Sequence, residues 1–266
     1  MYGFRQFSLL PSFPPQPNPQ IKEFLMRSSL TRRNFTTLTA AAVCGISGSL
    51  VSAQGMRSRT PVQESARISL LPPRMEGGMP LFEALAKRKT TRAFSTRMPD
   101  LQTLSDLLWC ADGINRDDGR RTAPSALNSQ TIALYVILPN GVYLYDPAAN
   151  ALVRKLEGNF QKLAGTQEYA QKVPVTLVYV SDLAKSNCSP ETREPYARVD
   201  CGFIGQNVYL FAASEGLATV FRGSLDFAGL AKMLKLKEGQ IVLYAQSVGY
   251  PEEDEKRHAS PVRLVK

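Results

Sequence analysis

The sequence is poor in the residues that most catalytic and metal-binding motifs need. Only one of its 266 residues is a histidine, His258 in the charged C-terminal segment, and a Ser–His or Cys–His nucleophile needs a histidine beside it. The four cysteines show none of the spacings of zinc or iron–sulfur ligands. No Gly-x-Gly-x-x-Gly run follows an expected strand. These absences argue against a hydrolase, a metal centre and a tightly held nicotinamide dinucleotide.

The cysteines are expected to differ in exposure. Cys110 and Cys201 fall in apolar, helical contexts and are expected to be small core residues. Cys188 lies in a polar loop, and we expect it to be the one that is exposed enough to react.

Basic residues are too few and too scattered to indicate a nucleic-acid-binding protein. The formal net charge is +9, and the five basic and one acidic side chains of residues 1–53 hold +4 of it, which leaves +5. The sequence has no arginine-rich arm and no basic stripe with interleaved aromatic residues. We therefore expect no nucleic acid among the partners.

The N-terminal part resembles a twin-arginine-type signal peptide. Thr31-Arg-Arg-Asn-Phe35 precedes a mildly apolar run from about Leu38, and Val51-Ser-Ala53 supplies a cleavage pattern before Gln54. The run is too short and too polar for a stable membrane span, and an uncleaved membrane anchor is the alternative. Met26 is a candidate for the true start. The signal predicts a periplasmic or otherwise exported protein, and the twin-arginine route suits an enzyme that acquires its cofactor before it leaves the cytoplasm.

Three parts are expected along the chain. Residues 1–53 form the N-terminal extension with the signal, and residues 54–78 form an extended arm that wraps a partner subunit or is disordered. Residues 79–266 form the folded domain, within the size range of a single core.

The apolar periodicities predict a mixed sheet flanked by helices, hence an α+β fold. Asn140-Gly141 is typical of a type I′ hairpin turn, and Gly216 of a helix end. The expected helices lie near 79–88, 100–111, 199–215 and 226–235, and the expected strands at 132–138, 142–146, 174–181 and 241–248.

Arg88 and Arg92 lie four residues apart at the end of an apolar-periodic stretch, with Thr90 between them. Guanidinium groups match phosphate oxygens in a forked geometry, and the threonine hydroxyl adds a donor. The segment therefore fits a phosphorylated ligand, or it is a solvated basic helix end that complements the helix dipole.

The stretch Thr122-Ala-Pro-Ser-Ala-Leu-Asn-Ser-Gln130 is a second candidate ligand-binding element. Its small residues let a ligand approach the backbone, and its Ser and Asn side chains both donate and accept hydrogen bonds. That suits a flat ring with polar edges. The alternative is an ordinary turn before the strand that begins near Ile132.

In this order and spacing, the two segments resemble the nitroreductase family of flavin enzymes, over roughly residues 79–251. Family members bind FMN between two identical subunits, so the resemblance implies FMN and a homodimer. The family's Arg-x-Ser/Thr-x-Arg/Lys element binds the FMN phosphate and ring edge, which places these roles on Arg88, Thr90 and Arg92. A Pro-Ser-x-x-Asn-x-Gln loop of the partner subunit covers the flavin in relatives, and it matches Pro124, Ser125, Ala126, Asn128 and Gln130.

Two later segments extend the resemblance. The helix that ends in Glu215-Gly-Leu217 is similar to the family's helix with a Gly-Leu stop, so the backbone at Gly216 and Leu217 is expected to face the flavin. Val248-Gly-Tyr-Pro251 is similar to a family strand after which a basic residue reaches the phosphate, a role for Lys256 or Arg257. The helix over 199–215 is apolar on much of its circumference, so we expect it to be buried, either in the domain core or at a dimer seam. Because the family builds its flavin site across the dimer, the resemblance favours the seam.

Within the family, the region Gly113–Ser125 looks closer to the branch with SagB-type, azoline-oxidising dehydrogenases of peptide modification. Arg116, Arg120 and Arg121 would attract an anionic substrate to the mouth of the site, or lie in a solvated loop. No tyrosine or lysine can be assigned from the sequence as the base that an azoline oxidation needs. The branch leaves the reaction open.

The sequence thus predicts an exported α+β protein with a nitroreductase-like fold and FMN at the homodimer interface. The expected function is an FMN-dependent oxidoreductase that transfers hydride through the flavin to a small-molecule electron acceptor, a nitroaromatic or a quinone. The alternatives are an FMN-dependent dehydrogenase of a peptide or small molecule, and a non-catalytic flavin-binding protein. The electron donor is NAD(P)H for a cytoplasmic protein and a quinol or partner protein for an exported one. No side chain is assigned as catalytic acid or base, and no metal is expected.

Overall fold

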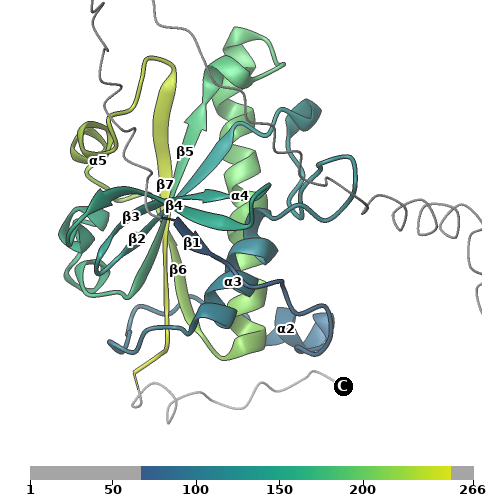
Figure 1. Cartoon of the computed structure of the whole chain (residues 1–266), viewed down its shortest axis with the longest axis vertical. Coiled ribbons are helices and arrows are strands. Elements are labelled where there is room, and N and C mark those ends of the chain that lie inside the picture. Colours follow the sequence, from purple (N-terminus) through teal and green to yellow (C-terminus); the bar gives the residue numbers. More distant parts are fainter. Residues whose placement is uncertain (1–66, 253–266) are drawn as a thin grey trace, which may run out of the picture. The chain divides into compact units, whose positions relative to one another are not determined.

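The computed structural model describes residues 67–252, which form a seven-stranded sheet with helices on both faces (Figure 1). The strand order is β1-β4-β3-β2-β5-β7-β6, and every neighbouring pair is antiparallel. The strands are β1 (Arg67–Ser69), β2 (Ile132–Leu138), β3 (Gly141–Asp146), β4 (Ala151–Glu157), β5 (Val175–Asp182), β6 (Ala218–Arg222) and β7 (Gln240–Gly249).

The α+β architecture is confirmed, and its sheet is antiparallel in every described pair. A helical connection from β5 to β6 would ordinarily produce a parallel pair. Here β7 lies between β5 and β6, so the two strands point the same way without touching. The connection from β5 to β6 therefore joins two parallel strands, but no two parallel strands of the described sheet are hydrogen-bonded to each other.

The helices lie close to their expected positions, with one large difference. With Ser189 as its N-cap, α4 starts at Pro190, nine residues earlier than the apolar pattern suggested, and it continues through Pro195 before it ends at Gly216. Gly216 adopts a left-handed φ of 67°, which confirms it as the helix stop. The helices are α2 (Leu81–Lys87), α3 (Leu101–Asp112), α4 (Pro190–Glu215) and α5 (Phe227–Leu234), with 3₁₀ turns η1 (Ala126–Asn128), η2 (Gln161–Ala164), η3 (Glu168–Gln171) and η4 (Leu183–Lys185). None of the helices in the described part of the chain has the length and apolarity needed to cross a bilayer.

The β2–β3 hairpin occurs where it was expected, but its turn is not type I′. Leu138 pairs with Gly141, so Pro139 and Asn140 form the two-residue loop. A type I′ turn needs positive φ at both loop positions, and neither has it. Proline fixes φ near −65°, which makes that turn type impossible here.

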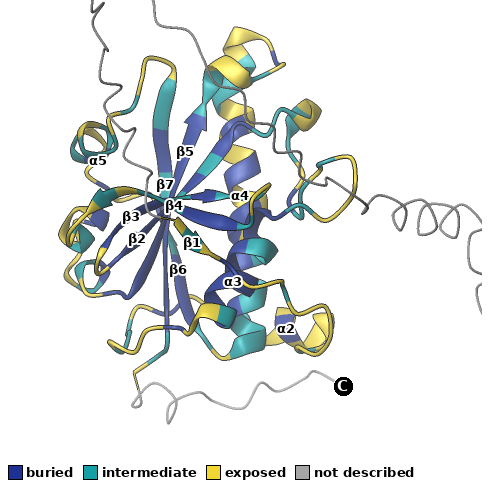
Figure 2. Cartoon of the chain, viewed as in Figure 1, coloured by how far each residue is buried: buried dark blue, intermediate teal, exposed yellow. Residues whose placement is uncertain are grey.

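The two faces of the sheet are covered by different helices (Figures 1 and 2). Leu107 of α3 and Val208 of α4 belong to the core cluster on one face. Leu230 of α5 belongs to the cluster on the other face, with Ile137 and Val178 of the sheet. The sheet is therefore buried on both sides, and Figure 2 shows most of its strands in dark blue.

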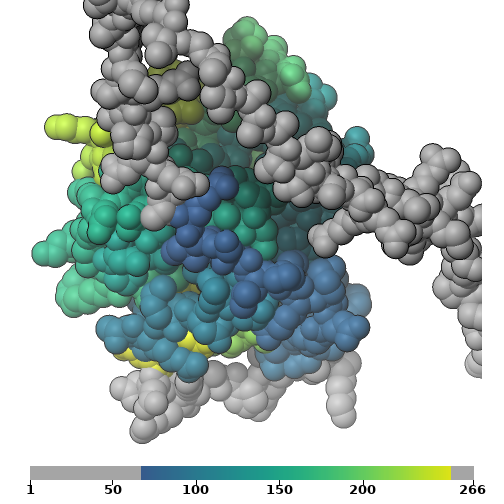
Figure 3. Space-filling view, viewed as in Figure 1, coloured from purple at the N-terminus to yellow at the C-terminus, as the bar shows by residue number. Residues whose placement is uncertain are grey.

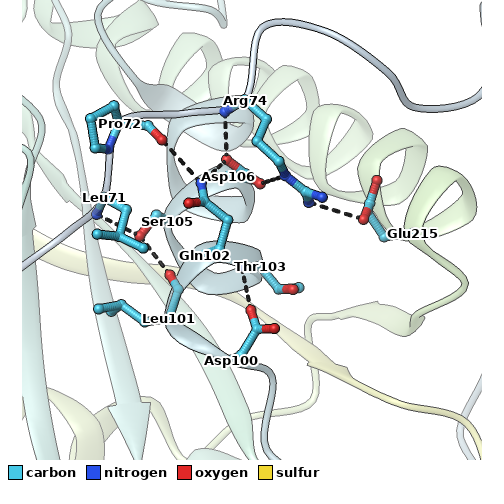
Figure 4. Close-up of polar contacts among 10 residues, drawn as sticks. All are labelled: Leu71, Pro72, Arg74, Asp100, Leu101, Gln102, Thr103, Ser105, Asp106 and Glu215. Carbon is cyan, nitrogen blue, oxygen red and sulfur yellow. Dashed lines mark hydrogen bonds and ion pairs between the residues drawn. The ribbon is translucent and has the colours of Figure 1, made fainter.

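Residues 70–79, which we call the strap, fasten the N-terminal end of the described chain to α3 and α4 (Figure 4). Arg74 donates from its backbone N–H and its Nε to the two oxygens of Asp106, at 2.9 and 2.6 Å. Its Nη2 also donates to Glu215, at 3.1 Å, in the last turn of α4. The N–H of Met79 donates to Ser214 Oγ at 2.8 Å. Figure 3 shows the strap and α2, in blue, together on one face of the molecule.

The described end of the expected arm therefore packs on its own chain. β1 pairs with β4 at the edge of the sheet, and the strap continues from it across α3. Residues 54–66 and the signal region lie outside the described residues. Whether the arm reaches a partner subunit stays a prediction.

A buried polar network ties β5, β6, β7 and α4 together beneath the helix. Gln246 is fully buried, and it accepts a hydrogen bond from the Tyr179 hydroxyl at 2.6 Å. Its amide nitrogen donates to the Gly205 carbonyl at 3.3 Å and to Thr219 Oγ1 at 3.1 Å. Buried polar groups of this kind stabilise a fold only when each has its partner.

Gln246→Ala is expected to destabilise the protein by about 2 to 4 kcal/mol, because it opens a cavity and leaves the Tyr179 hydroxyl without an acceptor. Gln240→Ala, the same change on the same strand at a partly exposed position, should cost less than about 1 kcal/mol. Urea denaturation at matched protein concentrations measures both. Equal losses for the two variants would show that the network contributes nothing.

Candidate cofactor-binding site

The segment from Arg88 to Arg92 is organised by a tyrosine that the sequence analysis missed. The Arg88 guanidinium lies 5.3 Å from the ring centre of Tyr209, a residue of α4. Thr90 Oγ1 lies 2.9 Å from the Tyr209 hydroxyl, which also accepts the backbone N–H of Phe221 at 3.0 Å. Tyr209 therefore holds Arg88 and Thr90 on one side of the segment. The stretch Gln206-Asn207-Val208, which directly precedes Tyr209, is the sequence signal that could have drawn attention to this tyrosine.

The same segment is fixed by the sheet. The N–H of Thr91 donates to the Thr219 carbonyl of β6 at 3.0 Å, and the N–H of Ser95 donates to the Tyr250 carbonyl at 2.9 Å. This brings the Gly-Tyr-Pro segment after β7 beside the two arginines, as the motif order indicated. Lys256, the basic residue expected to follow it, lies outside the described residues.

A pocket of about 250 Å³ opens between this segment and the end of α4. Lysines at its rim suit an anionic group, and its small residues leave the backbone accessible. The N–H groups of Gly216 and Leu217 both donate to the Ala212 carbonyl, so this helix end offers carbonyl acceptors to a ligand. The pocket is lined by Lys87, Lys89, Thr91, Tyr209, Ala212, Ala213, Gly216, Leu217, Ala218 and Pro251.

Arg92 faces a neighbouring depression of about 220 Å³ rather than the pocket itself. Tyr169 and Lys172 line this depression, and neither was identified from the sequence. Lys172 is paired with Glu168 at 2.7 Å. Thr91 and Arg92, which follow each other in the segment, thus line two different spaces.

The loop Pro124–Gln130 lies apart from both spaces. Pro124, Ser125 and Gln130 line a separate small void with Asp112 and Asp200, and none of the loop residues lines the pocket beside Gly216. The Asp200 carboxylate accepts the N–H of Ala126 at 3.1 Å. The segment 88–92 and the loop 124–130 were expected to form two parts of one flavin site. Within one chain they line separate spaces.

Asp112 and Arg121 form a buried ion pair behind this loop, which sequence reasoning did not find. Arg121 Nη1 lies 2.8 Å from Asp112 Oδ2, and both side chains are largely shielded from solvent. Burial raises the pKa of Asp112 to about 7, the Arg121 charge opposes that rise, and Asp200 adds to it. Burial likewise raises the pKa of Asp200, against the hydrogen bond from Ala126.

The three arginines of this region therefore differ. Arg121 turns inward to Asp112, so the expectation that it lines the mouth of the site is wrong. Arg120 is exposed and pairs with Asp118 at 3.3 Å, and Arg116 donates to Asn115. The expectation that Cys188 is exposed enough to react is also wrong, because this residue, near the start of α4, is only 9% exposed.

An apolar stripe remains uncovered on α4. Tyr196, Val199 and Phe203 recur at helical spacing and expose 47%, 52% and 44% of their surface, while Ile204 and Val208 face the core. Phe82 on α2 exposes 86%. An exposed apolar stripe of this kind indicates a contact surface. A larger pocket of about 520 Å³ lies under the strap, and none of the expected site residues lines it.

Comparisons with known proteins agree with these features. The family model described as the Nitroreductase family matches residues 85–250 of this chain. The chain is 35% identical to a nitroreductase-type protein of Ralstonia eutropha of known crystal structure, with a TM-score of 0.68 over 72% of this chain and 92% of that one. It is 29% identical to a provisionally named nitroreductase of Methanocaldococcus jannaschii, over 61% of this chain and 88% of the relative. It is 28% identical to an NADPH-flavin oxidoreductase of Vibrio harveyi, over 39% of this chain and 48% of that protein.

The buried Asp112 carboxyl predicts a specific pH dependence of stability. Because its folded-state pKa is about 7 against an ordinary value of 3.8, the folded protein binds more protons than the unfolded chain between these values. The unfolding free energy should therefore fall as pH rises through this window, by at most about 1.4 kcal/mol per unit. Asp112→Asn removes the titrating group, so the advantage of wild type over the variant should shrink with rising pH.

Urea denaturation of both proteins between about pH 5 and pH 8 measures the difference. Asp118→Asn, at the exposed partner of Arg120, is the control and should show no such trend. A wild-type advantage over Asp112→Asn that stays constant with pH would mean that the Arg121 charge outweighs burial.

Proposed function

This chain belongs to the nitroreductase family of oxidoreductases, and on that basis we propose that it works as an FMN-dependent homodimer. The observation that carries the proposal is the separation of two half-sites on one chain. The pocket beside Gly216 has cationic residues but none of the loop residues, and the loop 124–130 has hydrogen-bonding groups but lines only a small void of about 10 Å³. A second copy of the chain supplies the missing half to each.

The residues present fit FMN. Lys87, Lys89 and Arg88 supply positive charge for a phosphate, and Thr90 supplies a hydroxyl held by Tyr209. Carbonyl groups at the end of α4 suit the imide N–H of a flavin ring, and Arg92 stands at the adjoining depression. When bound, the flavin supplies the hydride chemistry, and the protein positions it and tunes its potential. A non-catalytic flavin protein is disfavoured, because the family is one of oxidoreductases.

The stripe of Tyr196, Val199 and Phe203 supports a second copy of the chain as the partner. It lies on the same helix as Gly216 and Tyr209, so its burial brings another chain next to the pocket. Most oligomers of this kind are symmetric dimers, in which one patch meets its own copy. The dimer and the completed flavin site are thus one proposal.

For the reaction, we propose hydride transfer through the flavin to a small electrophile such as a nitroaromatic or a quinone. The name of the Vibrio harveyi relative supports NADPH as the donor wherever that reductant is present. The twin-arginine-type signal supports export, and an exported enzyme would take electrons from a quinol or a partner protein. No described observation favours the dehydrogenase direction.

The full-length protein is expected to bind one FMN per chain, which absorbance and fluorescence titration measure. Arg88→Ala should raise the FMN dissociation constant about 10- to 100-fold, since it removes a charge-assisted contact. Arg154→Ala, at a remote arginine paired with Glu157 on the sheet, is the control and should leave binding unchanged. No FMN binding by wild type would overturn the proposed cofactor, and wild-type affinity in Arg88→Ala would remove Arg88 from the site.

Phe203→Glu is expected to weaken the dimer at least tenfold, because it places a charge in the apolar stripe of each chain. Sedimentation equilibrium measures the dimer, and FMN affinity should fall with it. Glu191→Ala, at the exposed start of the same helix, is the control. A monomer that retains full FMN affinity would contradict the shared site.

A further inference from the structure

The loop 124–130 has a backbone that its own residues disfavour. Leu127, Asn128 and Gln130 all adopt left-handed φ angles, of 51°, 51° and 47°. None is a glycine, and Leu127 and Gln130 do not belong to the residue types, such as asparagine, that tolerate this conformation well. Surrounding contacts must therefore hold the loop in place.

Fixed groups of the same chain provide these contacts. Asp200, which is 3% exposed, accepts the N–H of Ala126, and Ser125 Oγ accepts the N–H of Gln130 at 3.1 Å. Ser129 Oγ accepts the N–H of Asn187 at 3.0 Å, from the segment that precedes α4. The loop is held at both ends and in its middle, so its exposed side chains have defined directions.

A chain of side-chain hydrogen bonds then sets the orientation of one of these side chains. Arg121, fixed by Asp112, donates from Nε to Gln130 Oε1 at 3.1 Å. Since an arginine only donates, the Gln130 amide must present its oxygen to Arg121 and its nitrogen elsewhere. Gln130 Nε2 donates to Asn128 Oδ1 at 3.1 Å and to the Gly119 carbonyl at 3.2 Å.

The orientation of Asn128 follows from this. Its Oδ1 is taken by Gln130, so the amide N–H donors of this exposed side chain remain for a ligand. We propose that Arg121 is a positioning residue, which acts through Gln130 to make Asn128 a hydrogen-bond donor to a ring carbonyl oxygen of the flavin held by the second chain. This inference rests on the proposed function, and it assigns the polarity of one contact within it.

The polarity has a chemical consequence. Ring carbonyl oxygens of a flavin accept hydrogen bonds in both redox states, and they become more negative on reduction. A donor at that position therefore favours the reduced flavin. An acceptor at the same position would repel the oxygen in both states and lower the reduction potential.

Gln130→Glu tests the relay most sharply. The carboxylate still accepts from Arg121, but it cannot donate to Asn128, so the Asn128 amide is expected to turn and present its oxygen to the flavin. We expect the FMN dissociation constant to rise about tenfold and the reduction potential to fall. Arg121→Met should act in the same direction, while Arg121→Lys, which keeps a donor-only charge but loses the fork that binds Asp112 and Gln130 together, should give an affinity between those of Arg121→Met and wild type.

Two comparisons separate this role from a general structural one. Arg120→Gln, at the exposed neighbour paired with Asp118, should bind FMN as wild type does. In an Asn128→Ala background, Gln130→Glu should cause no further loss of FMN affinity, because Gln130 then has no Asn128 side chain to orient. The same loss with and without Asn128 would overturn the proposal, as would unchanged affinity and potential in Gln130→Glu. Absence of FMN binding by wild type would instead overturn the proposed function, and this inference with it.

Discussion

Helix α4 is the constraint on which the rest of the structure depends. Its inner face carries Val208 into the main core, and its end at Gly216 shapes the basic pocket. Tyr209 holds the segment of the two arginines, and Asp200 holds the strained loop. Its outer face exposes the apolar stripe around Phe203. A single element of 26 residues thus fixes the spacing between the basic pocket, the loop 124–130 and the apolar stripe.

Features that depend on residues adjacent in the sequence could be predicted from local signals. Gly216 was predicted as a helix end because a Glu-Gly stop is a local signal, whereas the flavin-binding roles of Arg88 and Gly216 stay predictions. The contact between Asp200 and Ala126 spans 74 positions, and Arg121 looked like any loop arginine, so only the fold could reveal them. The strand β4 was missed because its charged residues dilute the alternation, and it is recognisable as a strand chiefly through its pairing with β3.

The region around the loop contains two features that oppose folding. It combines left-handed residues with two buried carboxylates whose pKa values are raised by burial. Each feature opposes folding by a modest amount, and each makes the position of Asn128 more definite. Natural proteins commonly concentrate such conflicts where geometry matters more than stability. Elsewhere, the Gln246 network shows the opposite solution, with buried polar groups fully paired.

β1 and the strap also determine how the domain resists a pulling force. A force applied to the described chain at Arg67 is borne first by the three residue pairs between β1 and β4. Beyond them, Arg74 transmits the load to Asp106 and Glu215 on two different helices. The central strands lie behind both barriers. The β1–β4 pairing and the contacts of Arg74 are therefore expected to break before the pairing of the central strands does.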